Sequence, residues 1–292
     1  MRRIRSLLLG CAWLILIAGC GTAPEAAVPS SSVAPSASAV PSASASSTTQ
    51  DTSLTVFAAA SLTEAFGEIG QQFEQQHGIK VTFNFAGSQQ LSQQLAQGAE
   101  ADVFASANRQ EMQNAITSGS VISGTEQIFV RNRLVVIVPK DNPGQISQLQ
   151  DLARSGLKLV FAAEQVPVGG YTQQALTKMS ADPAFGSDFG TKVIANVVSQ
   201  EQNVKSVVTK VSLGEADAGV VYTSDVTPAV SDTIATVAIP DTFNQIAAYP
   251  IAPTSDPPAG QELAQQFVDF VLSAEGQSIL GRYNFIVEQT GN

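Results

Sequence analysis

The sequence predicts an α/β protein in which mainly parallel sheets are flanked by helices. β-favouring runs alternate along the chain with segments whose apolar residues recur at helical spacing, which is the pattern of βαβ units. Several of these runs end in small or hydroxyl residues where a helix is expected to begin. Ligands of such sheets bind beyond the carboxyl ends of the strands. We therefore expect the functional site at these strand-to-helix junctions.

The predicted strands are short and rich in Val, Ile and Phe. They cover residues 54–59, 80–85, 102–105, 134–138, 158–161, 218–222 and 236–239. Amphipathic spacing predicts helical segments at residues 91–95, 175–179, 204–213, 261–272 and 277–282. No repeat at a solenoid period interrupts this order, and the part after residue 52 is long enough for one large or two modest domains.

The start of the chain is typical of a secretory signal. Three arginines precede an apolar run at residues 7–17, which is too short to span a membrane, and small residues lead to Cys20. This end resembles a lipobox, so we expect a signal peptide at residues 1–19 and a lipid on Cys20; the alternative is an ordinary signal with an incidental cysteine. Residues 20–52 are almost all Ala, Ser, Pro, Thr and Val and predict a disordered tether. The folded part is thus expected outside the cytoplasm, anchored to the outer face of the membrane or in the periplasm.

Composition excludes several kinds of chemistry. Cys11 leaves with the predicted signal and Cys20 is acylated, so disulfide and iron–sulfur sites are not expected. His77 is the only histidine, which argues against a histidine-rich metal site and a Ser-His-Asp triad. The formal charge of −10, which becomes −13 without the signal arginines, argues against nucleic acid as a partner. We expect no cofactor and no directly bound metal cation.

The first junction carries the most information. The strand at residues 54–59 leads to Ser61, and Leu62, Phe66, Ile69 and Phe73 follow on one face of a helix. Free N–H groups and a hydroxyl at a helix start form an anion-binding seat. Ser61 with Glu64 three residues later also fits a capping box, so a purely structural cap is the alternative.

Similar junctions follow along the chain. Ser88 comes after the second predicted strand, and Val168 stands before a Gly-Gly pair that lets the backbone approach a ligand. Asn203 is a candidate cap for a helix that begins at Val204, and Tyr222 ends another strand. Ser88 could equally be a structural cap, the two valines core residues and Tyr222 a buried tyrosine with a satisfied hydroxyl. Only the N–H groups of the valines would serve a ligand.

The order of these motifs resembles a known family, the extracytoplasmic molybdate-binding proteins of bacterial ABC importers. The matching segments are Val-Phe-Ala-Ala-Ala-Ser-Leu at 56–62, Phe-Ala-Gly-Ser at 85–88, Ala-Asp-Val-Phe-Ala-Ser-Ala at 101–107, Leu-Val-Val-Ile-Val-Pro-Lys at 134–140, Val-Pro-Val-Gly at 166–169, Gly-Val-Val-Tyr-Thr-Ser-Asp at 219–225 and Arg-Tyr-Asn-Phe at 282–285. By this resemblance Ser61, Ser88, Val168, Val204 and Tyr222 hold the oxyanion. Val168 stands where Ala is familiar, and Lys205 stands where Arg is common.

The resemblance also implies a two-lobed periplasmic-binding-protein fold of type II. Two crossing strands, near residues 127–133 and 246–249, would join the lobes. Lobe I would comprise residues 53–127 plus 249–292, and lobe II residues 128–248. The expected partners are molybdate or tungstate, the permease subunits of an ABC importer, and the membrane through the Cys20 lipid; we expect a monomer.

A seat made only of donors suits a fully deprotonated tetrahedral anion. Helix N-termini contribute positive potential without a buried counter-charge, and no carboxylate is present to accept the proton of hydrogen phosphate. Molybdate, tungstate or sulfate is therefore favoured over phosphate. The alternatives are a receptor for sulfate or another oxyanion, a hydrolase with Ser61 as nucleophile, and a ferric-ion receptor, which would need paired tyrosines and an acid.

Overall fold

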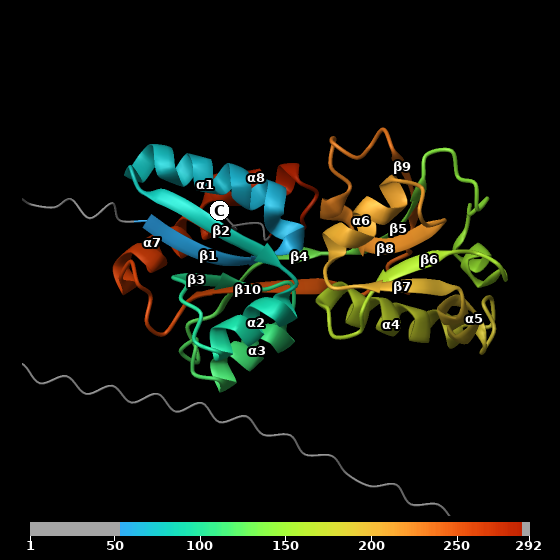
Figure 1. The fold of residues 1–292 in the computed structure, drawn as a ribbon, viewed down its shortest axis with the longest axis horizontal. Coiled ribbons are helices and arrows are strands. Elements are labelled where there is room, and N and C mark those ends of the chain that lie inside the picture. Colours follow the sequence, from blue (N-terminus) through green and yellow to red (C-terminus); the bar gives the residue numbers. More distant parts are fainter. Residues whose placement is uncertain (1–52, 288–292) are drawn as a thin grey trace, which may run out of the picture. The chain divides into compact units, whose positions relative to one another are not determined.

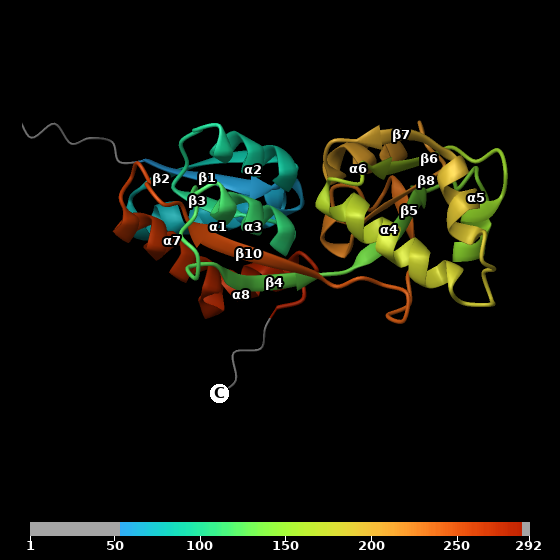
Figure 2. The ribbon, with the colours of Figure 1, turned by 90° about the horizontal axis from the view of Figure 1, so that it is seen from below.

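The computed structural model describes residues 53–287, which form two five-stranded sheets, each flanked by helices (Figures 1 and 2). The predicted signal peptide, the Cys20 lipid site and the tether lie outside the described residues. The strand orders are β2-β1-β3-β10-β4 and β7-β6-β8-β5-β9. The fold is therefore the two-lobed α/β architecture predicted. The sheets are mixed: in each, four strands run in the same direction and one strand, β10 or β5, runs antiparallel to both of its neighbours.

Lobe I is built on the first sheet. Its strands are β1 (Ser53–Ala59), β2 (Lys80–Ala86), β3 (Val103–Ala105), β4 (Gln127–Asn132) and β10 (Ala247–Pro253). The helices α1 (Thr63–His77), α7 (Gln261–Leu272) and α8 (Ala274–Arg282) pack together on one face, and α2 (Ser88–Ala96) and α3 (Arg109–Thr117) cover the other (Figure 1). The predicted apolar stripe of α1 is confirmed, because Leu62, Phe66, Ile69 and Phe73 are all fully buried. Gly78 ends the helix in the left-handed conformation that glycine adopts without strain.

Lobe II is built on the second sheet. Its strands are β5 (Leu134–Pro139), β6 (Leu159–Ala162), β7 (Val197–Glu201), β8 (Ala218–Tyr222) and β9 (Ile234–Ala238). The helix α6 (Val204–Ser212) covers one face, and α4 (Pro167–Ser180) and α5 (Phe189–Ala195) pack together on the other (Figures 1 and 2). Short 3₁₀ turns complete the chain: η1 (Ala60–Leu62), η2 (Leu149–Ala153) and η3 (Thr223–Asp225).

The chain passes between the sheets twice. It leaves lobe I between β4 and β5 and returns between β9 and β10, and β4 and β10 pair antiparallel within the first sheet. The predicted boundaries at residues 127 and 249 fall inside these two strands, so the pair belongs with lobe I up to Asn132. The division of the chain into residues 53–127 plus 249–292 and residues 128–248 stays a prediction.

Three elements have no counterpart in the sequence prediction. The strand β7 lies at a sheet edge, where residues alternate in exposure, and its Ser-Gln-Glu end is too polar to show a strand pattern. The helix α3 carries few apolar residues, and α5 has only seven residues, which is too short for a helical period to show. Within residues 53–287 no helix is both long and apolar enough to cross a membrane.

Candidate functional site

Five residues singled out in the sequence line one small cavity. Ser61, Ser88, Val168, Val204 and Tyr222 all border the same small space. Each is at most 4% exposed. The remaining lining residues are small, apolar or amide-bearing: Ala59, Ala60, Ala86, Gly87, Ala107, Val166, Pro167 and Asn203. The structure thus brings together residues that lie far apart in the chain and come from both lobes.

Strand register explains why the lobe I residues meet. The parallel strands β1 and β2 place Ala59 beside Ala86, and each alanine stands two residues before its serine. Ser61 therefore lies in η1 next to Ser88, the first residue of α2. Both serines stand at the carboxyl edge of the sheet, as expected of a ligand site in an α/β fold.

Two helix starts of lobe II face the same cavity. Val168 is the second residue of α4 and Val204 the first residue of α6. The first N–H groups of a helix have no carbonyl partner within it, and they carry the positive end of the helix dipole. Side-chain identity matters little for this role. The Val168 side chain, placed where Ala is familiar in the family, is completely buried in the core.

Local sequence fixes where these two helices begin. Pro167 occupies the first turn of α4, where its missing N–H costs nothing. A Cβ on Gly169 would lie 2.0 Å from the carbonyl oxygen of Ala163, so only glycine lets α4 start this close to the end of β6. Asn203 caps α6, as predicted, by accepting the N–H of Ser206 at 3.0 Å.

The Ser61 hydroxyl belongs to a buried hydrogen-bond chain. Its Oγ lies 2.9 Å from the Tyr249 hydroxyl, which also accepts the Asn132 amide at 3.3 Å. When Tyr249 donates to Ser61, the serine proton is free to face the cavity. The predicted capping box is wrong, because neither η1 nor α1 has a side-chain cap and Glu64 contacts Lys205 instead.

Ser88 is also prepared to donate. Its Oγ accepts the backbone N–H of Ala107 at 3.0 Å, which occupies one lone pair and leaves the hydroxyl proton for another partner. Gly87 caps this helix start, and its N–H donates to the Gln90 side chain at 3.2 Å. The hydroxyl is held at the cavity wall by the Ala107 N–H and by the place of Ser88 at the start of α2.

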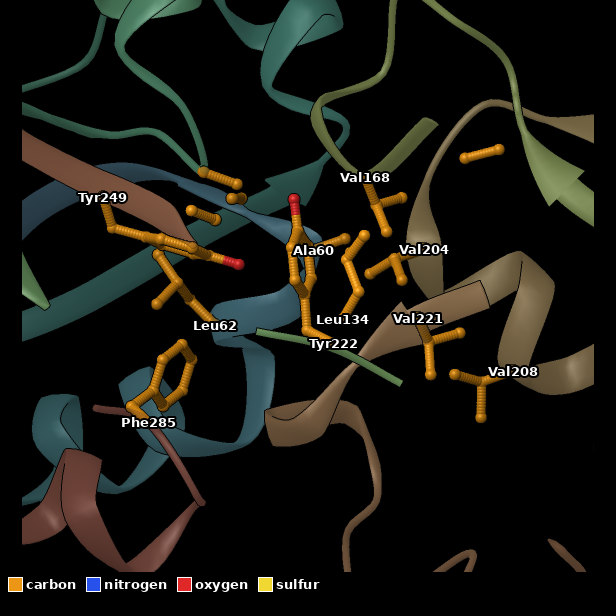
Figure 3. Packing of buried hydrophobic residues seen from close by; sticks show 14 of the residues in the cluster. Ala60, Leu62, Leu134, Val168, Val204, Val208, Val221, Tyr222, Tyr249 and Phe285 are labelled. Atoms are coloured by element: carbon orange, nitrogen blue, oxygen red, sulfur yellow. The ribbon is translucent and has the colours of Figure 1, made fainter. Parts of the chain in front are cut away.

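The Tyr222 hydroxyl is the feature of the cavity that points most directly to a ligand. The residue ends β8, is 1% exposed, and its hydroxyl has no hydrogen-bond partner among the described residues. Figure 3 shows the ring extending from the end of β8, with its hydroxyl remote from the strand and with Ala60, Val168 and Val204 nearby. Burial raises the pKa of Tyr222 well above its ordinary value, so the hydroxyl stays protonated and can donate. A buried donor without an acceptor is unusual in a folded protein.

A buried ionic cluster lies directly behind this wall. The Asp225 carboxylate is 1% exposed and accepts the Tyr222 backbone N–H at 3.1 Å. Lys205 contacts Asp225 at 3.1 Å and Glu64 at 2.7 Å. Burial alone would lower the pKa of Lys205, but the two carboxylates outweigh it and raise that pKa. The lysine is thus charged and held away from the cavity.

A wider groove adjoins the cavity and shares Val166 and Pro167 with it. Polar and charged side chains such as Arg109 and Glu164 line this groove, which is open to solvent. Its charged, exposed lining makes it a poor seat for a small anion, and the cavity lined by the five buried residues is the candidate site. Among residues 53–287 no group of three or more His, Cys, Asp or Glu side chains could hold a metal ion.

Comparison with known proteins identifies the family. The family described as bacterial extracellular solute-binding protein matches residues 54–286. The chain belongs to this family. It is 38% identical over 237 residues to the molybdate-binding protein of Mycobacterium tuberculosis. The aligned region covers 80% of this chain and 84% of the relative.

Solved structures of this solute-binding fold superpose on both lobes. The periplasmic molybdate-binding protein of Azotobacter vinelandii matches with a TM-score of 0.70 and 19% identity, covering 81% of this chain and 100% of that one. A sulfate-binding protein of Mycobacterium tuberculosis matches with a TM-score of 0.72 and 18% identity, covering 82% and 88%. At these identities the likeness concerns the fold alone.

Sequence reasoning missed the residues that stand behind the cavity of this solute-binding protein. Tyr249 and Asp225 are buried residues that contact Ser61 and Tyr222 without lining the cavity, and Asn132 donates to the Tyr249 hydroxyl. The Tyr-Thr-Ser-Asp segment at 222–225 did contain a signal, because an acid three residues after a buried tyrosine can reach back to its N–H. Tyr249 gave none, since 188 residues separate it from Ser61.

Proposed function

We propose that this protein binds molybdate, and tungstate equally, outside the cytoplasm and delivers it to an ABC importer. The observation that carries the proposal is the Tyr222 hydroxyl, a buried donor that lacks an acceptor and borders the same cavity as Ser61 and Ser88. A tetrahedral dianion in the cavity would supply that acceptor. The relative from Mycobacterium tuberculosis is a molybdate-binding protein, which supports the same ligand.

The proposed ligand set consists of donors only. Ser61, Ser88 and Tyr222 would donate through hydroxyls, and Val168 and Val204 through backbone N–H groups at helix starts. Charge-assisted hydrogen bonds of this kind are stronger than neutral ones. Since no lining residue in the described part of the chain is acidic, hydrogen phosphate would find no acceptor for its proton.

The surroundings of Ser61 do not support a catalytic role. A serine nucleophile needs a base within hydrogen-bond reach. The group that contacts Ser61 is Tyr249, and burial raises the pKa of its hydroxyl well above the ordinary value, which makes it a poor base. We therefore propose a binding protein without enzymatic activity or resident cofactor, which works as a monomer, is anchored through Cys20 and docks on the permease subunits of the importer.

Isothermal titration with four anions at pH 6 and pH 8 tests the ligand. Molybdate and tungstate should bind with similar affinity, sulfate more weakly because it is too small for all donors to reach, and phosphate not at all. Affinity for molybdate should stay nearly unchanged between the two pH values, since the proposed donors do not titrate there. Tight phosphate binding, or a steep change between pH 6 and pH 8, would contradict a seat made only of neutral donors.

Sulfate is the second candidate. The sulfate-binding protein of Mycobacterium tuberculosis shares the fold, and a donor-only seat accepts sulfate chemically. The two candidates differ in anion size, since sulfate is smaller than molybdate. The same titrations would reassign the protein if sulfate bound more tightly than molybdate.

A further inference from the structure

One ion pair joins the two ligand-bearing helix starts of opposite lobes. Glu64 lies in the first turn of α1, three residues after Ser61. Lys205 follows Val204 in the first turn of α6. The Lys205 ammonium lies 2.7 Å from the Glu64 carboxylate, although 141 residues separate them in the chain. The contact therefore spans the cleft directly beside the proposed donors.

The lysine is held on its own lobe by a second carboxylate. Asp225, which is almost fully buried in lobe II, lies 3.1 Å from the same ammonium and also accepts the Tyr222 N–H. Lys205 is thus fixed in place whether or not lobe I approaches. The Glu64 contact is the part of the cluster that forms only when the lobes come together.

We propose that Glu64 and Lys205 form an ionic clasp that holds the lobes closed on the bound oxyanion and slows its release. The inference rests on the proposed function, and it adds two positioning residues that do not touch the ligand. Because the pair forms after the anion has entered, it acts on the dissociation rate more than on the association rate. Its side chains keep 25% and 35% exposure, so solvent screening limits its strength.

The direction in which molybdate affinity changes when Glu64 loses its charge distinguishes a clasp from simple electrostatic repulsion. Glu64 is a negative group close to the seat of a dianion, so through-space repulsion alone predicts that removing its charge tightens binding. A clasp predicts the opposite, because the closed state loses a contact that the open state never had. Glu64→Gln therefore gives opposite results under the two explanations.

Glu64→Gln is also the cleaner of the two possible changes. It leaves Lys205 paired with Asp225 inside lobe II. Lys205→Gln would instead leave the buried Asp225 carboxylate without a counter-charge, and a buried charge that loses its partner is strongly destabilising. Lys205→Arg keeps the charge and serves as the conservative variant.

Glu68→Gln provides a matched control. Glu68 lies one turn further along α1, is 30% exposed, and pairs with Arg282 of α8, which belongs to the same lobe. This variant loses the same charge and one ion pair, but no contact between lobes. It should leave the molybdate rate constants within about twofold of wild type.

The experiment measures molybdate association and dissociation rate constants by stopped-flow tyrosine fluorescence, with affinity from titration calorimetry. For Glu64→Gln we expect dissociation faster by roughly fivefold, the scale of a partly exposed ion pair, and little change in association. Lys205→Arg should stay near wild type. The melting temperature of ligand-free Glu64→Gln should equal that of wild type, because the open state lacks the contact that this change removes.

The outcomes distinguish the clasp from the function on which it rests. A wild-type protein that binds molybdate, with Glu64→Gln unchanged or tighter, overturns the clasp and leaves the function standing. Equal acceleration of dissociation in Glu64→Gln and Glu68→Gln also overturns it, since the effect would then not depend on bridging the lobes. A wild-type protein that binds none of the four anions overturns both.

Discussion

Replacing Tyr222 by Phe should weaken molybdate binding and leave the ligand-free protein at least as stable as wild type. The hydroxyl is buried and has no partner in the described structure. Because the hydroxyl has no partner, its removal takes no hydrogen bond from the ligand-free protein. It also removes the cost of a buried polar group without a partner, which is about 1–3 kcal/mol. The bound anion, by contrast, loses a charge-assisted hydrogen bond worth about 1.5–3 kcal/mol. The two effects have opposite signs, which general damage to the core would not produce.

The size of the effect follows from linkage. A loss of about 2 kcal/mol raises the dissociation constant by roughly thirtyfold. At a molybdate concentration one hundred times the wild-type dissociation constant, the ligand stabilises wild type by about 2.7 kcal/mol and the variant by about 0.9 kcal/mol. Tyr222→Phe should therefore lose about two thirds of the ligand-induced stabilisation.

Differential scanning calorimetry with and without molybdate measures both quantities. Tyr283→Phe is the control, because Tyr283 is a partly exposed tyrosine at the end of α8 and does not line the cavity. It should keep the full ligand-induced shift. The reasoning is refuted if Tyr222→Phe also keeps that shift, or if its ligand-free form melts well below wild type.

Three further predictions concern the seat, the closure of the lobes and pH. Ser61→Ala should weaken binding by about 1.5–3 kcal/mol, and Val204→Ala, which keeps its N–H, far less; equal losses in titration calorimetry would contradict the division into hydroxyl and amide donors. A Cβ on Gly87 would lie 2.4 Å from the carbonyl oxygen of Gln202 in the other lobe, so Gly87→Ala should hinder closure. In the presence of molybdate, small-angle scattering should give a larger radius of gyration for this variant than for wild type. The melting temperature of the ligand-free variant should equal that of wild type. A variant that becomes as compact as wild type in molybdate would contradict the idea that Gly87 is needed for the lobes to close. Burial raises the pKa of Tyr222 above its ordinary value of 10.0, so the folded protein holds this proton more tightly than the unfolded chain. Stability from this group is complete below that value and falls as the pH rises through the folded pKa; thermal melts between pH 8 and pH 11 should show a steeper alkaline loss for wild type than for Tyr222→Phe.

Sequence reasoning located the cavity because its walls are local features. Each wall is a strand end followed by a helix start, and capping residues, glycines and apolar spacing mark such junctions within a few positions. Asn203 and the stripe from Leu62 to Phe73 are examples that the structure confirms. Parallel register then brings the junctions together, because neighbouring parallel strands end at the same edge.

What the sequence could not show depends on contacts between distant segments. The Ser61–Tyr249 hydrogen bond and the Glu64–Lys205 ion pair join residues 188 and 141 positions apart. Ser61 and Glu64 have the spacing of a capping box, and the local pattern favoured that explanation. In the structure both side chains bind distant partners instead of capping the helix: Ser61 contacts the buried Tyr249, and Glu64 contacts Lys205 of the other lobe.

The backbone character of the seat also decides which substitutions it tolerates. At Val168 the proposed donor is an N–H, so the side chain is free to differ from the alanine familiar in the family provided that the core accommodates it. Its complete burial shows that the core does. What must be specified is the position at which α4 begins, and that depends on Pro167 and Gly169. Gly169→Ala would force a Cβ against the Ala163 carbonyl oxygen, and the N-terminus of α4 would have to move away from the cavity. A glycine whose place is fixed by a neighbouring carbonyl is therefore more essential to this site than the valine whose N–H would bind the anion.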